Sequence, residues 1–472
     1  MMSQKISIKE VQLFERDITL RLPFKFGAVT LTQAPQAFVR CRIELETGEM
    51  SWGMSAEMMA PKWFDKNPAL TNDQNIDQLR SALHLYRDAI LGNGTETAFG
   101  HYASLYNSHL SAGDNLGLNP ITASFGPALI DRAVIDALCR ANSISFATAM
   151  QNNLAGIQPG VLLPEFIGFN FDQFLSTLKP ATQLHARHTV GMADPLNHYD
   201  QPLASRLNDG LPETLEDVIK TYGITYFKIK VGGNLNEDIN RLKDIARILD
   251  TSPTPYLATL DGNEQYDNVD GVIELLRMMK GDADLKRLCS STLFIEQPIQ
   301  RATALERDVS TLANDFPVII DESDADLSAF PLARQKGYSG VSSKSCKGFY
   351  KSLINLARCQ IWSEQDNKPY FMSAEDLTSQ AGVSVQQDLA LVALLNLGHV
   401  ERNGHHYVHG MAGADEEEKS RFIEAHPDLY DRKNGQVCIR IEDGMLATGS
   451  LQCTGYGVGA EPDWTNMKPI IR

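Results

Sequence analysis

The sequence predicts an α/β fold, in which a TIM-type (β/α) barrel of seven or eight units is joined to an α+β domain. Two observations carry this prediction. From residue 184 onward, short apolar strands alternate with amphipathic helices, which is typical of parallel βαβ units. Several of these strands also end in a charged residue, as expected where parallel strand ends meet at one rim of a barrel. An open doubly wound sheet is the alternative, but it does not explain the charged strand ends.

The barrel region, 184–410, contains eight predicted strands, of which the last is weaker than the others. They are 188–192, 225–231, 256–261, 292–297, 317–321, 340–344, 369–373 and 397–401. Between them, apolar residues recur at helical spacing, for example in 236–250 and 326–337. Seven or eight such units fit a closed barrel.

Residues 1–183 are predicted to form a separate α+β domain. Residues 38–53 contain two strand patterns around a Thr-Gly turn, which predicts a β-hairpin. Helices are expected over 71–150, and "FGPALIDRAVIDALCRA" (125–141) has its apolar residues at helical spacing.

The C-terminal segment, 411–472, ends in glycine-rich turns, and we expect it to return to the first domain. Its acidic run "DEEEKSR" (415–421) is predicted to be a solvated helix face. The histidines of "GHHYVHG" (404–410) are interpreted as polar groups of a loop.

Composition excludes some classes of function. The chain of 472 residues has 59 acidic and 43 basic side chains, a net charge of -16, which argues against a nucleic-acid surface. Its seven cysteines are scattered without a CxxC pair, which is typical of reduced thiols in a reducing compartment. The charged N-terminus lacks a signal-peptide pattern, and no apolar run reaches membrane-spanning length. We therefore expect a cytoplasmic protein without a membrane or nucleic-acid partner.

The second predicted strand carries two lysines in the run "YFKIKVGG" (226–233). Side chains of a strand alternate between its faces, so Lys228 and Lys230 point the same way. Two like charges on one face repel each other and are costly to bury. They indicate either an exposed edge strand or a face that carries out chemistry.

Charged residues recur at the carboxyl ends of five successive predicted strands. They are Lys230, Asp261, Glu296, Asp321 and Lys344, separated by 31, 35, 25 and 23 residues, about one βα unit each. In a parallel barrel these ends converge on the rim where barrel active sites lie. A single acidic residue there is often a helix cap, but three in succession favour a metal site.

Three carboxylates at one rim repel one another unless a divalent cation holds them. Their hard oxygen donors favour Mg²⁺, with Mn²⁺ as the alternative, and no Cys/His cluster has zinc spacing. Lysines from the second and sixth strands would approach from opposite sides, each with its pKa lowered by a nearby cation. Lys228 would supply that cation for Lys230. This arrangement suits removal of the proton beside a substrate carboxylate, giving an enediolate that the metal stabilises.

The motifs "FKIKVGG", "LDGNEQY", "FIEQPI", "IIDES" and "SSKSCKG", in this order, resemble the enolase superfamily. The nearer likeness is to the muconate-lactonizing-enzyme type of the mandelate racemase/muconate lactonizing enzyme family. "FGPALIDRAVIDAL" and the C-terminal "DGMLATGSLQCTGYGVG" also match. The likeness covers most of the chain, with extra length around 60–118 and 145–180. It implies that residues 1–183 and 411–472 together form a capping domain.

The resemblance also implies roles for individual residues. Asp261, Glu296 and Asp321 would bind Mg²⁺, and Lys230 and Lys344 would be the acid/base pair, with Lys228 tuning Lys230. Glu375 occupies the position of a glutamate near the substrate, while Asn263 and Glu322 would orient the ligands or the lysine of the sixth strand.

Two assignments stay open at the level of sequence. Lys347 competes with Lys344 as the lysine of the sixth strand, and Asp376 competes with Glu375, either of which can instead cap a helix. The segments 22–30 and 52–64 are candidates to close over the substrate, although their aromatic and methionine side chains also suit packing between domains.

The predicted function is Mg²⁺-dependent abstraction of the α-proton of a small carboxylic acid. Racemisation or epimerisation, cycloisomerisation and β-elimination share this first step, so the protein is expected to be an isomerase, racemase or lyase. "FMSAEDL" lacks the histidine of mandelate-racemase-type and sugar-acid-dehydratase-type relatives, and "LGHVERNGHHYVHGM" lacks the DxD of dipeptide epimerases. The alternatives are a barrel enzyme that forms a Schiff base and a non-catalytic metal-binding paralogue. A homo-oligomer is expected.

Overall fold

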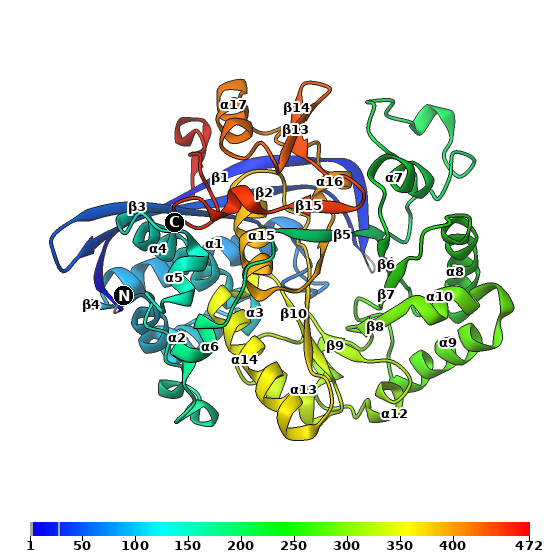
Figure 1. Cartoon of the computed structure of the whole chain (residues 1–472), viewed down its shortest axis with the longest axis horizontal. Helices are drawn as coiled ribbons and strands as arrows, with labels where there is room; N and C mark the ends of the chain where they lie inside the picture. The colour runs from blue at the N-terminus through cyan, green and yellow to red at the C-terminus, as the bar shows by residue number, and fades with distance from the viewer. Residues whose placement is uncertain (1–2, 27–28) are drawn as a thin grey trace.

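The computed structural model describes residues 3–26 and 29–472, and its centre is a closed barrel of parallel strands (Figure 1). Eight strands follow one another around the ring, and the last pairs with the first, so the predicted closed barrel is confirmed. The strands are β5(Gln183–Val190), β6(Tyr226–Lys230), β7(Leu257–Asp261), β8(Thr292–Glu296), β9(Val318–Ile320), β10(Gly340–Ser343), β11(Phe371–Ala374) and β12(His399–Arg402).

The first barrel strand begins earlier than the sequence pattern predicted. β5 starts at Gln183 rather than at residue 188. The sequence pattern missed its first residues because the polar His185 and Arg187 alternate with the apolar Leu184 and Ala186, although Arg187 is itself fully buried. Gln183, Leu184 and His185 also pair with a C-terminal strand, β15(Met445–Ala447), which widens the barrel sheet at this edge.

Helices cover the outside of the barrel, as the alternating pattern predicted. They are α7(Leu215–Tyr222), α8(Leu235–Asp250), α9(Val269–Gly281), α10(Lys286–Ser291), α11(Arg301–Ala304), α12(Ser310–Ala313), α13(Ala329–Gln335), α14(Phe349–Asp366), α15(Val383–Leu395) and α16(Gly404–Tyr407). Every residue of α15 is buried, because this helix contacts the N-terminal strand β3(Met50–Met58) as well as the barrel.

The N-terminal part combines an antiparallel sheet with helices. Its long strands β1(Lys5–Phe26) and β2(Val29–Leu45) pair with each other, β2 pairs with β3 in the predicted hairpin, and β4(Thr95–Thr97) pairs with β1. The helices are α1(Asn72–Leu91), α2(Ala98–Asn115), α3(Pro120–Ala123), α4(Phe125–Ala141), α5(Phe146–Gln151) and α6(Phe171–Ser176). α4 has the predicted bounds and packs against β3, since Gly53 leaves room for its backbone.

The C-terminal segment contacts both parts of the molecule. It contains α17(Glu416–Ala425), β13(Tyr430–Lys433), β14(Gln436–Ile439), β15 and β16(Lys468–Pro469). β15 joins the barrel sheet, whereas β16 pairs with β1. In Figure 1 the orange and red C-terminal segments accordingly lie beside the blue strands β1 and β2. The domain boundaries 1–183, 184–410 and 411–472 stay a prediction.

Of two sequence interpretations of polar segments, one holds only in part and the other is wrong. The acidic run is not wholly solvated, because Glu418 is buried and accepts hydrogen bonds of 3.0 and 2.7 Å from the guanidinium of Arg16 on β1. His405 and His406 do not belong to a loop but are buried in α16, beside His188 of β5. Periodicity did not reveal these contacts because the partners are far apart in the chain. No helix of the described ranges is long and apolar enough to cross a membrane.

Candidate active site

Three carboxylates stand side by side at the carboxyl end of the barrel. Asp261 ends β7, Glu296 ends β8 and Asp321 directly follows β9, and these strands are neighbours in the ring. Asp261 and Glu296 are partners in the register of their strands. All three side chains are at most 1% exposed, so the barrel rim holds a row of carboxylates out of water.

Lys230 and Lys344 stand at the two ends of this row. Lys230 ends β6, and its Nζ lies 2.5 Å from Asp261 Oδ2; Lys344 follows β10, and its Nζ lies 2.6 Å from Asp321 Oδ2. β6 and β10 lie across the ring from each other, because β7, β8 and β9 separate them on one side and β5, β12 and β11 on the other. The two amines therefore flank the carboxylates from opposite sides.

Lys228 lies deeper in the barrel and is surrounded by carboxylates. Its Nζ is 2.9 Å from Asp261 Oδ2, 2.8 Å from Glu296 Oε2, 2.8 Å from Glu375 Oε2 and 3.1 Å from Glu401 Oε2. Burial disfavours the charged ammonium, but these four neighbours together raise the pKa of Lys228 well above its ordinary value. The charge of Lys228 is thus compensated by acids of β7, β8 and β12 and by Glu375, which directly follows β11.

Asp321 dominates the pKa of Lys344 in this arrangement, and the lowered pKa expected beside a bound cation stays a prediction. Burial and the charge of Lys228 lower its pKa, but Asp321 outweighs both and raises it above the ordinary value. An ammonium that touches a buried carboxylate keeps its proton.

Lys344 and Lys347, the two candidate lysines after the sixth strand of the barrel, point into different cavities. Lys344 faces the same pocket as Lys228 and Lys230, and its Nζ lies 4.3 Å from the ring centroid of Trp63. Lys347 points elsewhere: its Nζ lies 2.7 Å from Ser342 Oγ and 3.1 Å from Asp324 Oδ2, and the residue lines a different cavity.

Glu375 and Asp376 also have distinct positions. Glu375 turns into the barrel, where it forms an ion pair with the fully buried Arg187 and accepts a 2.6 Å hydrogen bond from Ser373 Oγ. Asp376 lines the pocket and accepts backbone hydrogen bonds from Ser379 and Asn403, at 3.2 and 2.8 Å. Glu375 is therefore a buried partner of Lys228, and Asp376 is the residue beside the pocket.

Glu401 on β12 is a site residue that the sequence reasoning missed. It accepts hydrogen bonds from Thr189 Oγ1 at 2.5 Å, from Asn403 Nδ2 at 3.0 Å and from the Asp376 N–H at 3.0 Å. Burial favours its neutral form, but Lys228, Lys230 and Lys344 hold its pKa well below the ordinary value. The signal was present, since Glu401 lies near the carboxyl end of the weakest predicted strand.

Asn263 and Glu322 support the row of carboxylates. The Asn263 N–H donates a 2.8 Å hydrogen bond to Asp261 Oδ1, and its Nδ2 donates a 3.1 Å bond to Glu322 Oε1. Asn263 has a positive φ of 40°, a conformation that Asn tolerates better than most residues. These contacts connect the loop after β7 to the loop after β9.

The two N-terminal segments that were predicted to close over the substrate, 22–30 and 52–64, both contribute to the wall of the pocket that Lys228, Lys230 and Lys344 line. Phe24 comes from the segment 22–30, and Ala60 and Trp63 come from the segment 52–64. Residues 27–28 of the first segment lie outside the described residues. Leu31, Leu377, Thr378 and Asn403 complete the wall around the charged groups.

An ionic cluster fixes the second of these segments to the barrel. Glu264, which follows β7, pairs with Lys66 and with Arg301, whose Nε lies 2.8 Å from Glu264 Oε1. Arg301 also donates hydrogen bonds to the carbonyl oxygens of Trp63 and Phe64, at 2.8 and 3.1 Å. Trp63 is thereby held over the strand ends.

The chemistry of Asp261, Glu296 and Asp321 fits a hard divalent cation. Burial and the nearby Asp261 raise the pKa of Glu296 well above its ordinary value, so a further cation beside these hard oxygen donors would favour its charged form. In the present structure the Lys228 ammonium lies between the Asp261 and Glu296 carboxylates and contacts both. Within residues 3–26 and 29–472, no three His, Cys, Asp or Glu side chains are gathered closely enough to hold a metal ion. Binding therefore requires these carboxylates to exchange ammonium contacts for the cation.

Comparison with known proteins gives structural neighbours of low sequence identity. No family model and no curated protein sequence matches the chain. A dipeptide epimerase from Enterococcus faecalis, crystallised with Mg and the dipeptide L-Leu-L-Tyr, has a TM-score of 0.60 at 16% identity, over 96% of this chain and 99% of its own. A mandelate racemase/muconate lactonizing protein from Herpetosiphon aurantiacus has a TM-score of 0.59 at 17% identity, with the same coverage.

A member of the enolase superfamily from Roseovarius nubinhibens, complexed with magnesium, matches over 99% of both chains at 16% identity and a TM-score of 0.56. These likenesses extend over the barrel and the N-terminal sheet together. The subgroup of muconate-lactonizing type stays a prediction. The chain has the fold of the mandelate racemase/muconate lactonizing enzyme family of the enolase superfamily, as its motifs implied.

Proposed function

We propose that this protein is a Mg²⁺-dependent racemase or epimerase that exchanges the α-proton of a small carboxylic acid. The single observation that carries the proposal is the placement of Lys230 and Lys344 across the ring from each other, one at each end of a row of buried carboxylates. A proton can be removed from one face of the α-carbon and returned to the other only if two acid/base groups stand on opposite sides of it.

Asp261, Glu296 and Asp321 would hold the cation. When bound, Mg²⁺, or Mn²⁺ in its place, supplies positive charge that stabilises the negative charge developing on the substrate carboxylate. Asn263 supports these ligands through its hydrogen bonds to Asp261 and Glu322.

The lysines move the proton. Either Nζ takes the α-proton as an amine, and the opposite one delivers a proton to the other face as an ammonium. Lys344 can act as a base only after its 2.6 Å contact with Asp321 is broken, because that contact favours the charged ammonium. Racemisation or epimerisation employs both lysines, whereas cycloisomerisation or β-elimination needs one of them to abstract the proton.

The pocket supports a small substrate that is shielded from water. Trp63, Phe24 and Leu31 form an apolar cover, and Arg301 holds Trp63 in place. Exclusion of water strengthens the attraction between the substrate carboxylate and the cationic groups, and it protects the carbanionic species from unwanted protonation. Asp376 and Asn403 lie on the wall and are available to hydrogen-bond a polar group of the substrate.

The test is exchange of the α-proton with D₂O, followed by ¹H NMR over a library of N-acyl amino acids, dipeptides, 2-hydroxy acids and unsaturated diacids. The wild-type chain with Mg²⁺ is expected to exchange the α-proton of at least one class. Lys230→Ala and Lys344→Ala should each lose racemisation, while each retains exchange with the enantiomer that its remaining lysine faces.

Unchanged exchange in both variants would remove these lysines from the mechanism. If activity survives EDTA and borohydride traps the substrate on the protein, a Schiff-base enzyme replaces the proposal. If Mg²⁺ binds but no carboxylate in the library exchanges, the protein is a non-catalytic metal-binding paralogue.

A further inference from the structure

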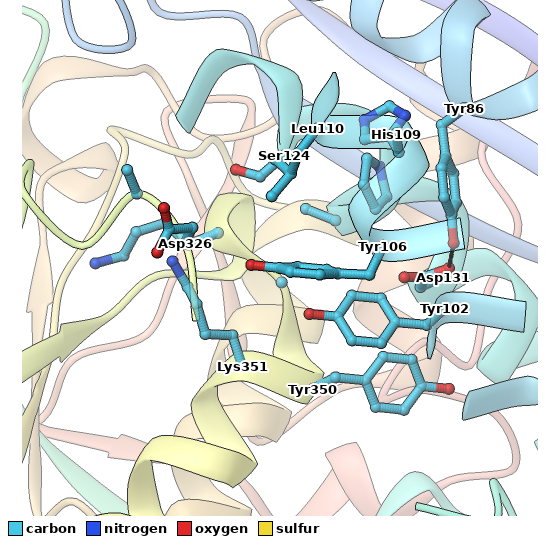
Figure 2. A pocket seen from close by; sticks show the side chains of 15 residues that line it. Tyr86, Tyr102, Tyr106, His109, Leu110, Ser124, Asp131, Asp326, Tyr350 and Lys351 are labelled. Carbon is cyan, nitrogen blue, oxygen red and sulfur yellow. Dashed lines mark hydrogen bonds between the residues drawn. The ribbon is translucent and has the colours of Figure 1, made fainter. Parts of the chain in front are cut away.

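A second cavity lies between the N-terminal helices and the barrel, apart from the proposed active site (Figure 2). Tyr86 of α1, Tyr102 and Tyr106 of α2 and Asp131 of α4 line it from one side, and Tyr350 and Lys351 of α14 line it from the other. Its volume is about 30 Å³, against the roughly 10–15 Å³ that one water needs by this measure, so it accepts only a few heavy atoms.

Asp131 is a buried carboxyl without a cationic partner. It is 5% exposed, and its one side-chain hydrogen bond comes from Tyr86 Oη at 2.9 Å. No Lys, Arg or His forms an ion pair with it in the part of the chain that the structure describes. Burial raises the pKa of Asp131 well above its ordinary value, since the Tyr86 hydrogen bond does not compensate for the loss of water.

Three tyrosine rings form the wall beside this carboxyl. Figure 2 shows Tyr106, Tyr102 and Tyr350 one above another, and the centroid of Tyr102 lies 5.5 Å from that of Tyr106 and 5.1 Å from that of Tyr350. The Tyr350 hydroxyl is buried and has no hydrogen-bond partner. The faces of such rings carry partial negative charge and attract cations within about 6 Å.

The lysines of the cavity do not neutralise Asp131. In Figure 2, Lys351 and Asp326 lie on one side of the tyrosine rings, while Asp131 and Tyr86 lie on the other. Lys351 Nζ contacts the Asp324 carbonyl oxygen at 2.5 Å and its carboxylate at 3.2 Å. The carboxyl end of the cavity therefore has no cation of the described chain beside it, and a bound cation there would favour the charged form of Asp131.

We propose that this cavity binds a small alkylammonium ion of the size of methylammonium. Asp131 provides the counter-ion, and the faces of the tyrosine rings receive the methyl and ammonium groups. The aromatic walls favour an alkylammonium ion over K⁺, which prefers several oxygen ligands. This binding does not depend on the proposed catalytic function.

The experiment measures thermal unfolding and isothermal titration of the full chain with methylammonium chloride. KCl and sodium acetate at equal ionic strength are the comparisons. Wild-type protein is expected to show saturable binding of methylammonium and a rise in Tm, with no saturable response to the other two salts. Asp131→Asn, which preserves the shape and the acceptor for Tyr86, should weaken binding by roughly tenfold or more.

Asp326→Asn is the matched control, because Asp326 also lines the cavity but lies at its other side. It should bind methylammonium as the wild type does. If Asp131→Asn does not fold, Tyr102→Phe and Tyr102→Leu replace it: Phe retains the ring face and should retain binding, and Leu should weaken it several-fold. The proposal would be overturned if Asp131→Asn or Tyr102→Leu bound methylammonium as tightly as the wild type does. It would also be overturned if the wild type responded to KCl as it does to methylammonium, or bound acetate saturably.

Discussion

At the scale of single residues, Lys228 is the cation that offsets the negative charge of four carboxylates inside the barrel. A cation that is 1% exposed lies within 3.1 Å of four carboxylates, and Arg187 joins the same cluster through Glu375. Lys228 therefore holds the acids of four strands together. Tuning of Lys230 by its charge, the role that the resemblance implied, stays a prediction.

Replacement of Lys228 by Met is expected to leave these carboxylates without their shared counter-charge. The free energy of unfolding should fall by about 3–5 kcal/mol, the usual cost of removing one partner from a buried ion pair. Urea unfolding measures this loss. Lys220→Met on the exposed face of α7 is the control and should change stability by less than about 0.5 kcal/mol. A Lys228→Met variant as stable as the wild type would show that the acids are protonated rather than paired.

Lys344 and Lys347 should differ in the kind of loss they cause. Lys344→Met is expected to reduce α-proton exchange from the enantiomer that Lys344 faces by about 10²–10⁴-fold, because this amine faces the pocket, and to lower stability as well, because Asp321 loses its 2.6 Å partner. Lys347→Met should lower the free energy of unfolding by about 3 kcal/mol, because Asp321 and Asp324 lose a buried partner, but should leave exchange in the folded protein unchanged. NMR exchange and urea unfolding of both variants separate the two roles, and a reversed pattern would assign the acid/base role to Lys347.

The sequence predicted which residues end the strands, but not what surrounds them. Asp261, Glu296 and Asp321 were predictable because one βα unit separates each from the next. The ion pair of Glu375 with Arg187 was not, because a strand pattern gives the face of a side chain and not its partner across the barrel. Glu401 was overlooked because polar residues weaken the apolar pattern of its short strand.

At the scale of elements, α17 shows how a polar helix can be partly buried. Its first turn contains Glu416, Glu417 and Glu418, and only Glu418 turns inward, to the guanidinium of Arg16 on β1. Composition predicted the helix and its acidic face, but the contact with β1 depends on how the chain folds back over its first strand. Helix bounds such as those of α4 were predictable because its apolar residues repeat at helical spacing over 17 residues.

Glu418→Gln should reduce the free energy of unfolding by about 3 kcal/mol, since it leaves a buried guanidinium without a counter-charge. Glu417→Gln, on the same turn but with an exposed side chain, should change it by less than about 0.5 kcal/mol. Chemical unfolding of the two variants provides the comparison. Equal effects would mean that the Arg16 contact adds nothing to stability.

His426, which follows α17, should make stability depend on pH. Its Nε2 accepts a 2.9 Å hydrogen bond from the Gly459 N–H, and burial lowers its pKa to about 4. Because the unfolded chain binds this proton near pH 6.5, the contribution of His426 is complete above that value and is lost as pH falls towards 4. The loss is at most about 3 kcal/mol. Unfolding of wild type and His426→Gln between pH 7 and 4 should show a shallower decline in the variant.

At the scale of the whole molecule, the C-terminal segment links the two sheets. β15 belongs to the barrel sheet and β16 to the N-terminal sheet, and both lie within the last 28 residues of the chain. The closed barrel could be predicted from the sequence because the alternation of short strands and helices is visible along consecutive residues. The two pairings of the segment could not, because short strands such as β16 carry almost no pattern of their own.

The barrel and the N-terminal sheet are expected to unfold in one transition because this segment joins them. Single-tryptophan variants that retain either Trp362 of α14 or Trp52 of β3 report the two parts separately, and their urea midpoints should coincide. Removal of residues 441–472 should separate the midpoints. Distinct midpoints in the full-length chain would show that the parts unfold independently.

The pairing of β12 with β5 also has a consequence for synthesis. A ribosome that adds about 5–20 residues per second needs roughly 10–40 s to pass from the end of β5 to the start of β12. Throughout that interval the nascent chain carries an open row of amide and carbonyl groups along β5. Chaperones that shield unpaired edges would therefore be needed most while this stretch is being translated.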